Sequence, residues 1–347
     1  MQQAISLVFL NWGHQIGYFF VWTYERFASL EERKIYAKQE LNSLPVSKEL
    51  KQAYWFLHVA ILLFGFTAIL GKLISLREVM LVWHRLWITC LSIAFIPGVI
   101  KALGNMTRRE IVRFMGIGLI TCLHWLTFYG SIKLANVSIA LSCLATTSLF
   151  TSFIEPLVFK RKVNPFEVVL GVVVAIGIII ITKATFGYRE GIITGLIAAF
   201  LASLFSTLNK KHMGNHNPIT MTFLELGAGF VFITALLPVY LHFFPEAKLM
   251  PDPSDWAWLI ILALVCTSVA YVLALIALKQ LSAFTANLAI NLEPVYGILL
   301  AILFFQEHKE LEAGFYLGTG LILFSVFLYP VIRRIQRKKA ERARLAA

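Results

Sequence analysis

Three charged residues lie within long apolar stretches of the chain, where a charge needs a partner or a water-filled cavity. Arg85 is the only Lys or Arg well inside such a stretch, and Glu225 and Glu293 lie in two others. In lipid, each such charge raises the free energy of insertion by about 2.5–3.5 kcal/mol. The sequence supports two roles for Arg85: a cation in a cavity or gate, and a structural ion pair with a carboxylate.

The segment around Glu293 has the features of a helix that opens toward a cavity. Pro294 removes a backbone donor and leaves the carbonyl of Ile290 without its helical partner. Asn287 and Asn291 share one helix face, whereas Glu293 lies roughly 200° round an ideal helix. Both sets reach one cavity only if the helix loosens at Pro294. Glu293 is therefore a candidate for substrate binding, with a buried interhelix hydrogen bond as the alternative.

Arg85 also begins a polar stripe, because Thr89 and Ser92 follow it on the same helical face. Glu225 has several interpretations. It could pair with Arg85, bind a proton, form part of an inner gate, or have a purely structural role.

His124 and Trp125 are adjacent in another apolar stretch. Together they could stack on a substrate and form hydrogen bonds with it. The alternative for His124 is a core histidine whose hydrogen bonds are satisfied within the protein.

Several reaction classes are excluded by the residues that the chain lacks. Of its 19 acidic residues, only Asp252 and Asp255 are aspartates, and both lie in one polar stretch. This excludes an intramembrane aspartyl protease pair, a prenyl-diphosphate metal site and an aspartyl-phosphate pump. The four cysteines are far apart, and no His-Glu-x-x-His motif is present. We therefore expect neither an enzyme nor a cofactor or metal.

The composition identifies the elements that must position these residues. Hydrophobic residues make up 59% of the 347 residues and charged residues 14%, whereas a soluble domain carries about 25% charge. The sequence therefore predicts an all-α polytopic membrane protein. The expected spans are 53–73, 78–99, 111–131, 136–158, 166–183, 191–209, 219–243, 256–278, 282–305 and 313–332.

Charge and internal similarity predict how these ten helices are arranged. Lys and Arg are concentrated in one set of alternate loops and in the tail after residue 332, so we expect a cytoplasmic C-terminus. Residues 133–183 align without a gap with 280–330. Because each repeat has five helices, the two copies must be inverted, as in secondary transporters. Glycines spaced four apart, Gly187, Gly191 and Gly195, and also Gly314 and Gly318, predict close helix contacts.

The chain resembles the drug/metabolite transporter superfamily, and specifically bacterial proteins with two EamA domains. The residues that carry the resemblance are the paired five-helix units, Trp83-His84-Arg85, and the run from Asn291 to Gly297 that continues to Phe305-Gln306-Glu307. The resemblance implies a cavity lined by helices 1–4 and 6–9, with helices 5 and 10 peripheral. Helix 4 departs from the family pattern, because Glu155-Pro156 is followed by Lys160-Arg161-Lys162.

These observations predict a secondary transporter in the bacterial inner membrane, working by alternating access. We expect a small polar or zwitterionic substrate, such as an amino acid, bound by Arg85, His124, Trp125, Glu225, Asn287, Asn291 and Glu293. The partners are the substrate and the lipid bilayer, without nucleic acid, and the protein is a monomer or a dimer. The alternatives are a non-transporting receptor or scaffold, and an exchanger of nucleotide sugars or phosphate compounds.

The expected organisation is an N-terminal extension (1–52), a first repeat (53–184), a second repeat (190–332) and a basic tail (333–347). The apolar stretch 4–24 lacks the basic start and cleavage site of a signal peptide. It fits an eleventh span, an interfacial helix, or a start codon placed too early.

Overall fold

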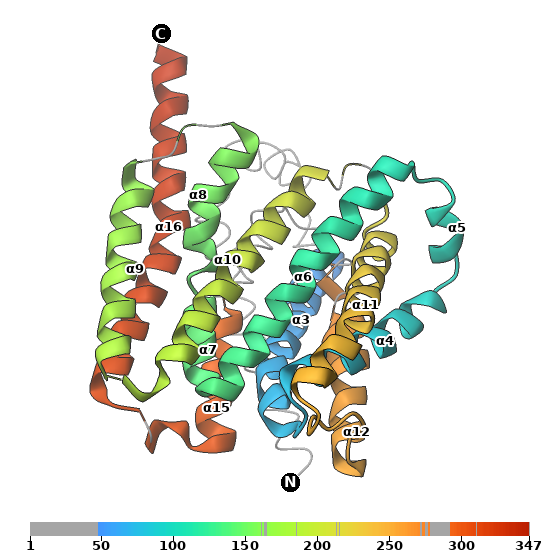
Figure 1. Ribbon diagram of the computed structural model, residues 1–347. Coiled ribbons are helices and arrows are strands. Elements are labelled where there is room, and N and C mark those ends of the chain that lie inside the picture. Colours follow the sequence, from blue (N-terminus) through green and yellow to red (C-terminus); the bar gives the residue numbers. More distant parts are fainter. Residues whose placement is uncertain are drawn as a thin grey trace.

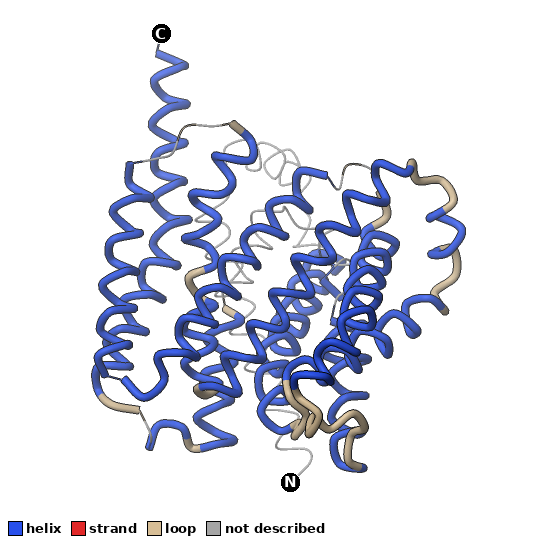
Figure 2. Tube along the Cα trace, in the orientation of Figure 1, coloured by secondary structure: helices blue, strands red, loops and turns tan. Residues whose placement is uncertain are grey.

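The computed structural model describes residues 48–160, 162, 165–184, 186–212, 214, 216–270, 273–274, 277, 292–309 and 311–346. Helices make up nearly all of the described chain, and no strand occurs within it (Figure 2). The apolar stretch 4–24, with its three interpretations, lies outside the described residues.

The long helices run up and down through one bundle (Figure 1). Those of the first half are α3 (Lys48–Leu73), α4 (Glu78–Ala94), α6 (Arg108–Leu134), α7 (Val137–Leu144), α8 (Thr147–Phe159) and α9 (Pro165–Ala184). Those of the second half are α10 (Arg189–His212), α11 (Pro218–Phe243), α12 (Pro253–Ile260), η2 (Ile261–Val269), α15 (Glu293–Phe305) and α16 (Ala313–Ala346). We call the end from which α16 extends the tail end, at the top of Figure 1.

By length and composition, five described segments can cross a membrane: Glu49–Leu73, Arg108–Leu134, Val137–Phe159, Arg189–Asn209 and Ile219–Phe243. Shorter apolar helices occupy the positions of four further expected spans, at Val172–Ile181, Pro253–Val269, Val295–Phe305 and Ala313–Ser325. The helix α4 occupies the remaining position. The predicted all-α membrane fold is therefore confirmed.

Three expected spans differ in detail from the helices that form. The span 78–99 ends early, because α4 stops at Ala94 and a short helix, α5 (Val99–Leu103), follows. The span 136–158 is broken between α7 and α8, where Thr146 Oγ1 donates to the Cys143 carbonyl at 2.6 Å. The last helix does not end at 332, since α16 continues to Ala346.

The eighth span changes its helical geometry part-way along. After one stretch of α-helix (α12) it continues as the π-helix η2. The hydroxyls of Thr267 and Ser268 donate to the carbonyls five residues earlier, Leu262 and Ala263, at 2.8 and 3.0 Å. π-Helical turns are rare and often occur at functional sites. This one turns both hydroxyl residues toward α4.

Side-chain oxygens fix where several helices begin. Thr107 and Glu110 form a reciprocal capping box at the start of α6, which is a common way to satisfy exposed backbone donors. Asn136 accepts from the Ile139 backbone at the start of α7, and Asn217 does the same for Ile219 in α11. Asn136 and Asn217 therefore set where the helices that follow them start.

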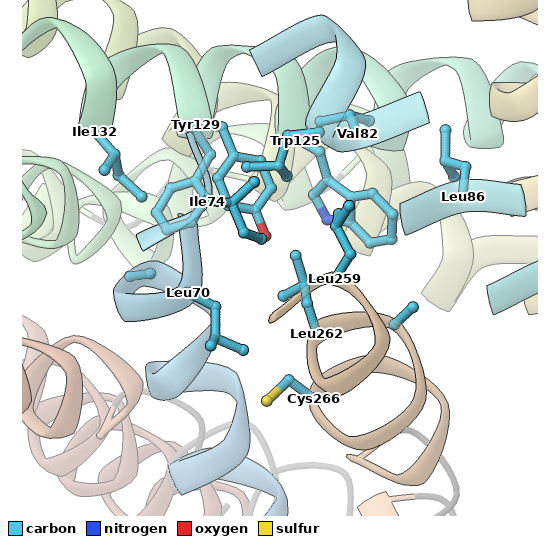
Figure 3. Packing of buried hydrophobic residues seen from close by; sticks show 14 of the residues in the cluster. Leu70, Ile74, Val82, Leu86, Trp125, Tyr129, Ile132, Leu259, Leu262 and Cys266 are labelled. Atoms are coloured by element: carbon cyan, nitrogen blue, oxygen red, sulfur yellow. The ribbon is translucent and has the colours of Figure 1, made fainter. Parts of the chain in front are cut away.

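The largest apolar core joins α3, α4, α6 and the α12–η2 helix. In Figure 3, Trp125 and Tyr129 of α6 project toward Leu259 and Leu262. The helices α9 and α16 pack on each other at one side of the bundle (Figure 1). This is the peripheral position that the resemblance implies for helices 5 and 10.

Glycines allow three of the predicted close contacts. A Cβ on Gly318 would lie 2.5 Å from the Gly177 carbonyl oxygen, and one on Gly191 would lie 2.5 Å from Ala135 Cβ. A Cβ on Gly195 would lie 2.8 Å from Ser131 Oγ. The prediction is wrong for Gly187, where a Cβ would have open space around it.

Candidate functional site

The Arg85 side chain is held in place by three residues from other helices. Its Nε donates to Thr267 Oγ1 at 3.0 Å and its Nη1 donates to the Tyr129 hydroxyl at 2.7 Å. The guanidinium carbon lies 3.7 Å from the centre of the Trp125 ring, an arrangement that favours a cation electrostatically. Arg85 is 5% exposed, so these contacts fix a buried positive charge between α4, α6 and η2.

All of these partners are uncharged. Within the described part of the chain, no carboxylate forms an ion pair with Arg85, and only two of its five N–H donors have a described hydrogen-bond partner. The alternative of a structural ion pair is therefore not supported by the described residues. Arg85 is therefore a preorganised cation, and its other N–H groups have no acceptor among the described residues.

The polar stripe that Arg85 begins faces the π-helix. Ser92 Oγ lies 2.6 Å from Ser268 Oγ, and Thr89 Oγ1 donates to the Ala263 carbonyl at 3.3 Å. Both contacts are on the side of α4 where Arg85 meets Thr267. The predicted shared face is confirmed, and the partner of this face is now defined.

Glu293 is the first residue of α15 and is partly exposed. Its carboxyl group is close enough to Arg85 for the two charges to interact through space, yet no ion pair within 4 Å joins them. Arg85 lies in the first half of the chain and Glu293 in the second. Asn287, Asn291 and the carbonyl of Ile290, which were predicted to act with Glu293, lie outside the described residues.

His124 and Trp125 contact different parts of the protein. His124 Nδ1 forms a 2.8 Å hydrogen bond with the Ala198 carbonyl of α10, and the ring stacks on Phe128. This is the alternative of a core histidine satisfied within the protein. Trp125 lies one residue further round α6 and contacts Arg85 instead. Trp125 thus lies against the Arg85 cation, whereas His124 has the backbone partner expected of a core histidine.

Glu225 belongs to a different location from Arg85. The Asn209 amide donates to Glu225 Oε2 at 3.1 Å. The backbone of Glu225 crosses α6 so closely that a Cβ on Gly118 would lie 2.1 Å from the Glu225 carbonyl oxygen. The interpretation in which Glu225 pairs with Arg85 is therefore wrong.

Two residues of the Arg85 site were missed by sequence reasoning. Tyr129 lies one helical turn after Trp125, so the spacing of these aromatic residues was an available signal. Thr267 could not be recognised in the same way. Its contact with Arg85 spans 182 positions of sequence and depends on the π-helix.

Comparison with known proteins defines the family. The sequence pattern described as the EamA-like transporter family matches residues 51–183 and 189–329. The chain is 25% identical over 235 residues to "Uncharacterized transporter YxxF" of Bacillus subtilis, covering 66% of this chain and 72% of that protein. It is 24% identical over 239 residues to an "Uncharacterized transporter" of Archaeoglobus fulgidus, covering 68% of this chain and 81% of that protein.

A solved crystal structure supports the fold alone. It superposes with a TM-score of 0.52 at 18% identity, covering 79% of this chain and 95% of that chain.

Proposed function

Because the chain belongs to the EamA-like transporter family, we propose that it is a secondary transporter of a small zwitterionic metabolite, such as an amino acid. The observation that carries this proposal is the Arg85 site. A buried guanidinium with uncharged partners interacts through space with a carboxylate, Glu293, with which it forms no ion pair. A ligand with one negative and one positive group would compensate both charges.

In this arrangement each end of the ligand has its own partner. The ligand carboxylate binds the unused N–H donors of Arg85, and the ligand ammonium binds the Glu293 carboxylate. Thr267, Tyr129 and Trp125 hold the guanidinium in place before the ligand arrives, which reduces the entropy lost on binding. Trp125 also provides an aromatic surface beside the bound ligand.

The positions of the two charges in the chain suggest how binding is linked to transport. Arg85 lies in the part of the chain matched by the first copy of the family pattern and Glu293 in the part matched by the second. A zwitterion that contacts both would join the two inverted repeats around a site between them, as alternating access requires. We place the tail end, with its basic residues, in the cytoplasm of a bacterial cell.

An exchanger of phosphate compounds is less well supported. A doubly charged phosphate calls for more than one deep cation, and Arg85 is the only buried Lys or Arg among the described residues. A receptor or scaffold would not need two separated opposite charges from different repeats. The membership of a transporter family also argues against an enzyme.

Thermal unfolding of the detergent-purified protein tests the proposal. Amino acids are compared with analogues that lack the amino group and with analogues that lack the carboxyl group. A ligand that binds the folded state raises its stability by RT ln(1 + [L]/Kd). We expect stabilisation by an intact amino acid, weaker stabilisation by both analogues, and loss of the effect in Arg85→Ala and in Glu293→Gln.

The control is Arg77→Ala, which removes an exposed arginine at the start of α4. This variant should retain the full ligand effect. A ligand that stabilises Arg85→Ala and Glu293→Gln as well as it stabilises the unchanged protein would overturn the proposed site. Uptake of the same compound into proteoliposomes then tests transport itself.

A further inference from the structure

Glu225 lies where three helices meet and has few hydrogen-bond donors. It is 7% exposed and lies two turns into α11, beside Asn209 of α10 and against Gly118 of α6. The Asn209 amide is the single donor to its side chain within the described chain, and no described Lys, Arg or His pairs with it. A carboxylate can accept about four hydrogen bonds, so most of its capacity is unused.

The neighbouring amide oxygen is also unsatisfied. Asn209 Oδ1 is buried and has no hydrogen-bond partner in the described structure. Two acceptor groups therefore lie side by side with one N–H between them. Buried acceptors without donors are unfavourable. Among the described residues, this location therefore has too few hydrogen-bond donors for its acceptors.

A proton on Glu225 would correct this shortage. The carboxylate binds one proton from water, which forms an O–H bond without any change of oxidation state. The new O–H is a donor, and rotation of the Asn209 amide by about 180° places Oδ1 opposite it, since amide oxygen and nitrogen are nearly isosteric. A divalent cation such as Ca²⁺ calls for about six to eight oxygens, more than these two side chains supply.

Charged and titratable groups on the helices around α11 have other partners or lie elsewhere. His124 of α6 binds the Ala198 carbonyl, Cys122 of α6 donates to the Gly229 carbonyl, and Glu110 of α6 pairs with His216. The remaining charged or titratable groups on α4, α5, α6 and α10 are Glu78, His84, Arg85, Cys90, Lys101, Arg108, Arg109, Arg113, Tyr129, Lys133, Arg189, Glu190, Lys210, Lys211 and His212. Among those whose side chains the structure describes, no basic group forms an ion pair with Glu225.

We propose that Glu225 and Asn209 form a proton-binding site, separate from the Arg85 site, that is loaded and emptied as the transporter changes conformation. The inference rests on the proposed transport function. Protonation changes the hydrogen bond between α10 and α11 at the point where both meet α6. The proton therefore acts on the contact between the two halves of the chain.

Infrared difference spectroscopy between acidic and alkaline buffers tests proton binding without a known substrate. We expect a carboxylic-acid C=O band that is lost in Glu225→Gln and retained in Glu293→Gln. Asn209→Leu should shift the frequency of this band because the hydrogen-bond partner changes. The spectra are recorded with and without sodium, and the band should not depend on sodium. A band that persists unchanged in Glu225→Gln would overturn the proposal.

Proton exchange on ligand binding tests coupling. The amino acid identified by thermal unfolding is added to the protein in weakly buffered detergent with a pH indicator. We expect a proton signal in the unchanged protein and its loss in Glu225→Gln, which still shows thermal stabilisation by the ligand. Glu293→Gln would lose both.

The two proposals fail in different ways. An intact proton signal in Glu225→Gln removes the coupling role alone. Absence of any stabilising ligand contradicts the substrate proposal and leaves the infrared result standing. Glu225→Asp, which keeps a carboxyl group, should retain a shifted band, and it replaces Glu225→Gln if that variant does not fold.

Discussion

Glu307 and Glu225 are both buried carboxylates, but their surroundings are opposite. Glu307 is fully buried and accepts from Lys72 Nζ at 2.9 Å. It also accepts from the backbone N–H groups of Val137 and Ser138 at 3.1 and 2.8 Å. Glu225 has one described donor, an uncharged amide. Within the described chain, Glu307 therefore has three donors and Glu225 has one.

The contacts of Glu307 join three parts of the chain. It lies in the short helix η3 (Glu307–Lys309) after α15, Lys72 is in the last turn of α3, and Val137 begins α7. A negative charge at a helix start is also favoured by the helix dipole. Glu307 therefore fixes these helices to one another at the end of the bundle opposite to the tail end.

The number of hydrogen-bond donors is our criterion for distinguishing a buried carboxylate that stabilises the fold from one that can bind a proton or a ligand. A carboxylate whose oxygens are all engaged has nothing left to bind, and its value lies in holding helices together. A carboxylate that lacks donors is available for a proton or a ligand. Burial alone, which the two residues share, does not distinguish these roles.

The same substitution at both positions tests this comparison most directly. In Glu307→Gln, one accepting oxygen becomes an NH₂ group, so a backbone N–H loses its acceptor and Lys72 loses its counterion. We expect a loss of about 3–5 kcal/mol in the free energy of unfolding, because two donors lose a charged acceptor and each such hydrogen bond contributes about 1.5–3 kcal/mol. Glu225→Gln keeps an oxygen for the Asn209 amide and should change stability by less than about 1 kcal/mol. Equal losses, measured by denaturant unfolding in detergent, would refute the distinction.

The close contact beside Glu225 gives the next largest effect. In Gly118→Ala the new methyl group meets the Glu225 backbone at 2.1 Å, so α6 and α11 must separate. We expect a loss of about 1–3 kcal/mol, typical of overpacking. The matched control is Gly116→Ala in the same helix, where a Cβ has no neighbour within 4 Å.

Gly116→Ala should be neutral or stabilising by up to about 1 kcal/mol, because alanine favours helix over glycine. The two variants are compared by thermal unfolding under identical conditions. If both lose the same stability, the contact between Gly118 and Glu225 is not tight, and the position assigned to Glu225 between three helices is wrong.

Sequence reasoning predicted the fold well because the fold depends on long apolar runs. Residues 108–134 and 218–243, for example, form helices close to the expected spans 111–131 and 219–243. The breaks were harder to predict. The break between α7 and α8 falls at three hydroxyl residues, Thr146, Thr147 and Ser148. Hydroxyl residues are also common inside membrane helices, and no proline lies there, so the local sequence does not mark the break.

The site was only partly predictable, for a physical reason. Arg85 and Glu293 were identified because a charge in lipid is exceptional. The role of Glu307 could not be predicted from its local sequence. It depends on a contact with Ser138 at the start of α7, which is 169 residues away in the chain. The partner of His124 could not be predicted, because it is a backbone carbonyl, which any residue could supply.

The hydroxyl that holds Arg85 offers a smaller test. Tyr129→Phe removes the acceptor of Arg85 Nη1 and keeps the aromatic ring. A single hydrogen bond contributes about 1 kcal/mol, so we expect roughly fivefold weaker ligand binding with stability little changed. Isothermal titration with the amino acid found by thermal unfolding measures this. Unchanged affinity would show that Arg85 does not need Tyr129 to hold its position.

The smallest expected effect comes from an exposed carboxylate near the opposite end from the tail, where Glu307 also lies. Glu246 pairs with Arg77 at 3.5 Å, and their side chains are 68% and 46% exposed. Glu246→Gln makes the same chemical change as Glu307→Gln, but water replaces the lost contact. We expect a change of about 0.5 kcal/mol or less, and salt should reduce it further. If Glu246→Gln lost almost as much stability as Glu307→Gln, the ion pair with a basic residue would explain the importance of Glu307. The number of buried donors would then not be what distinguishes Glu307 from Glu225.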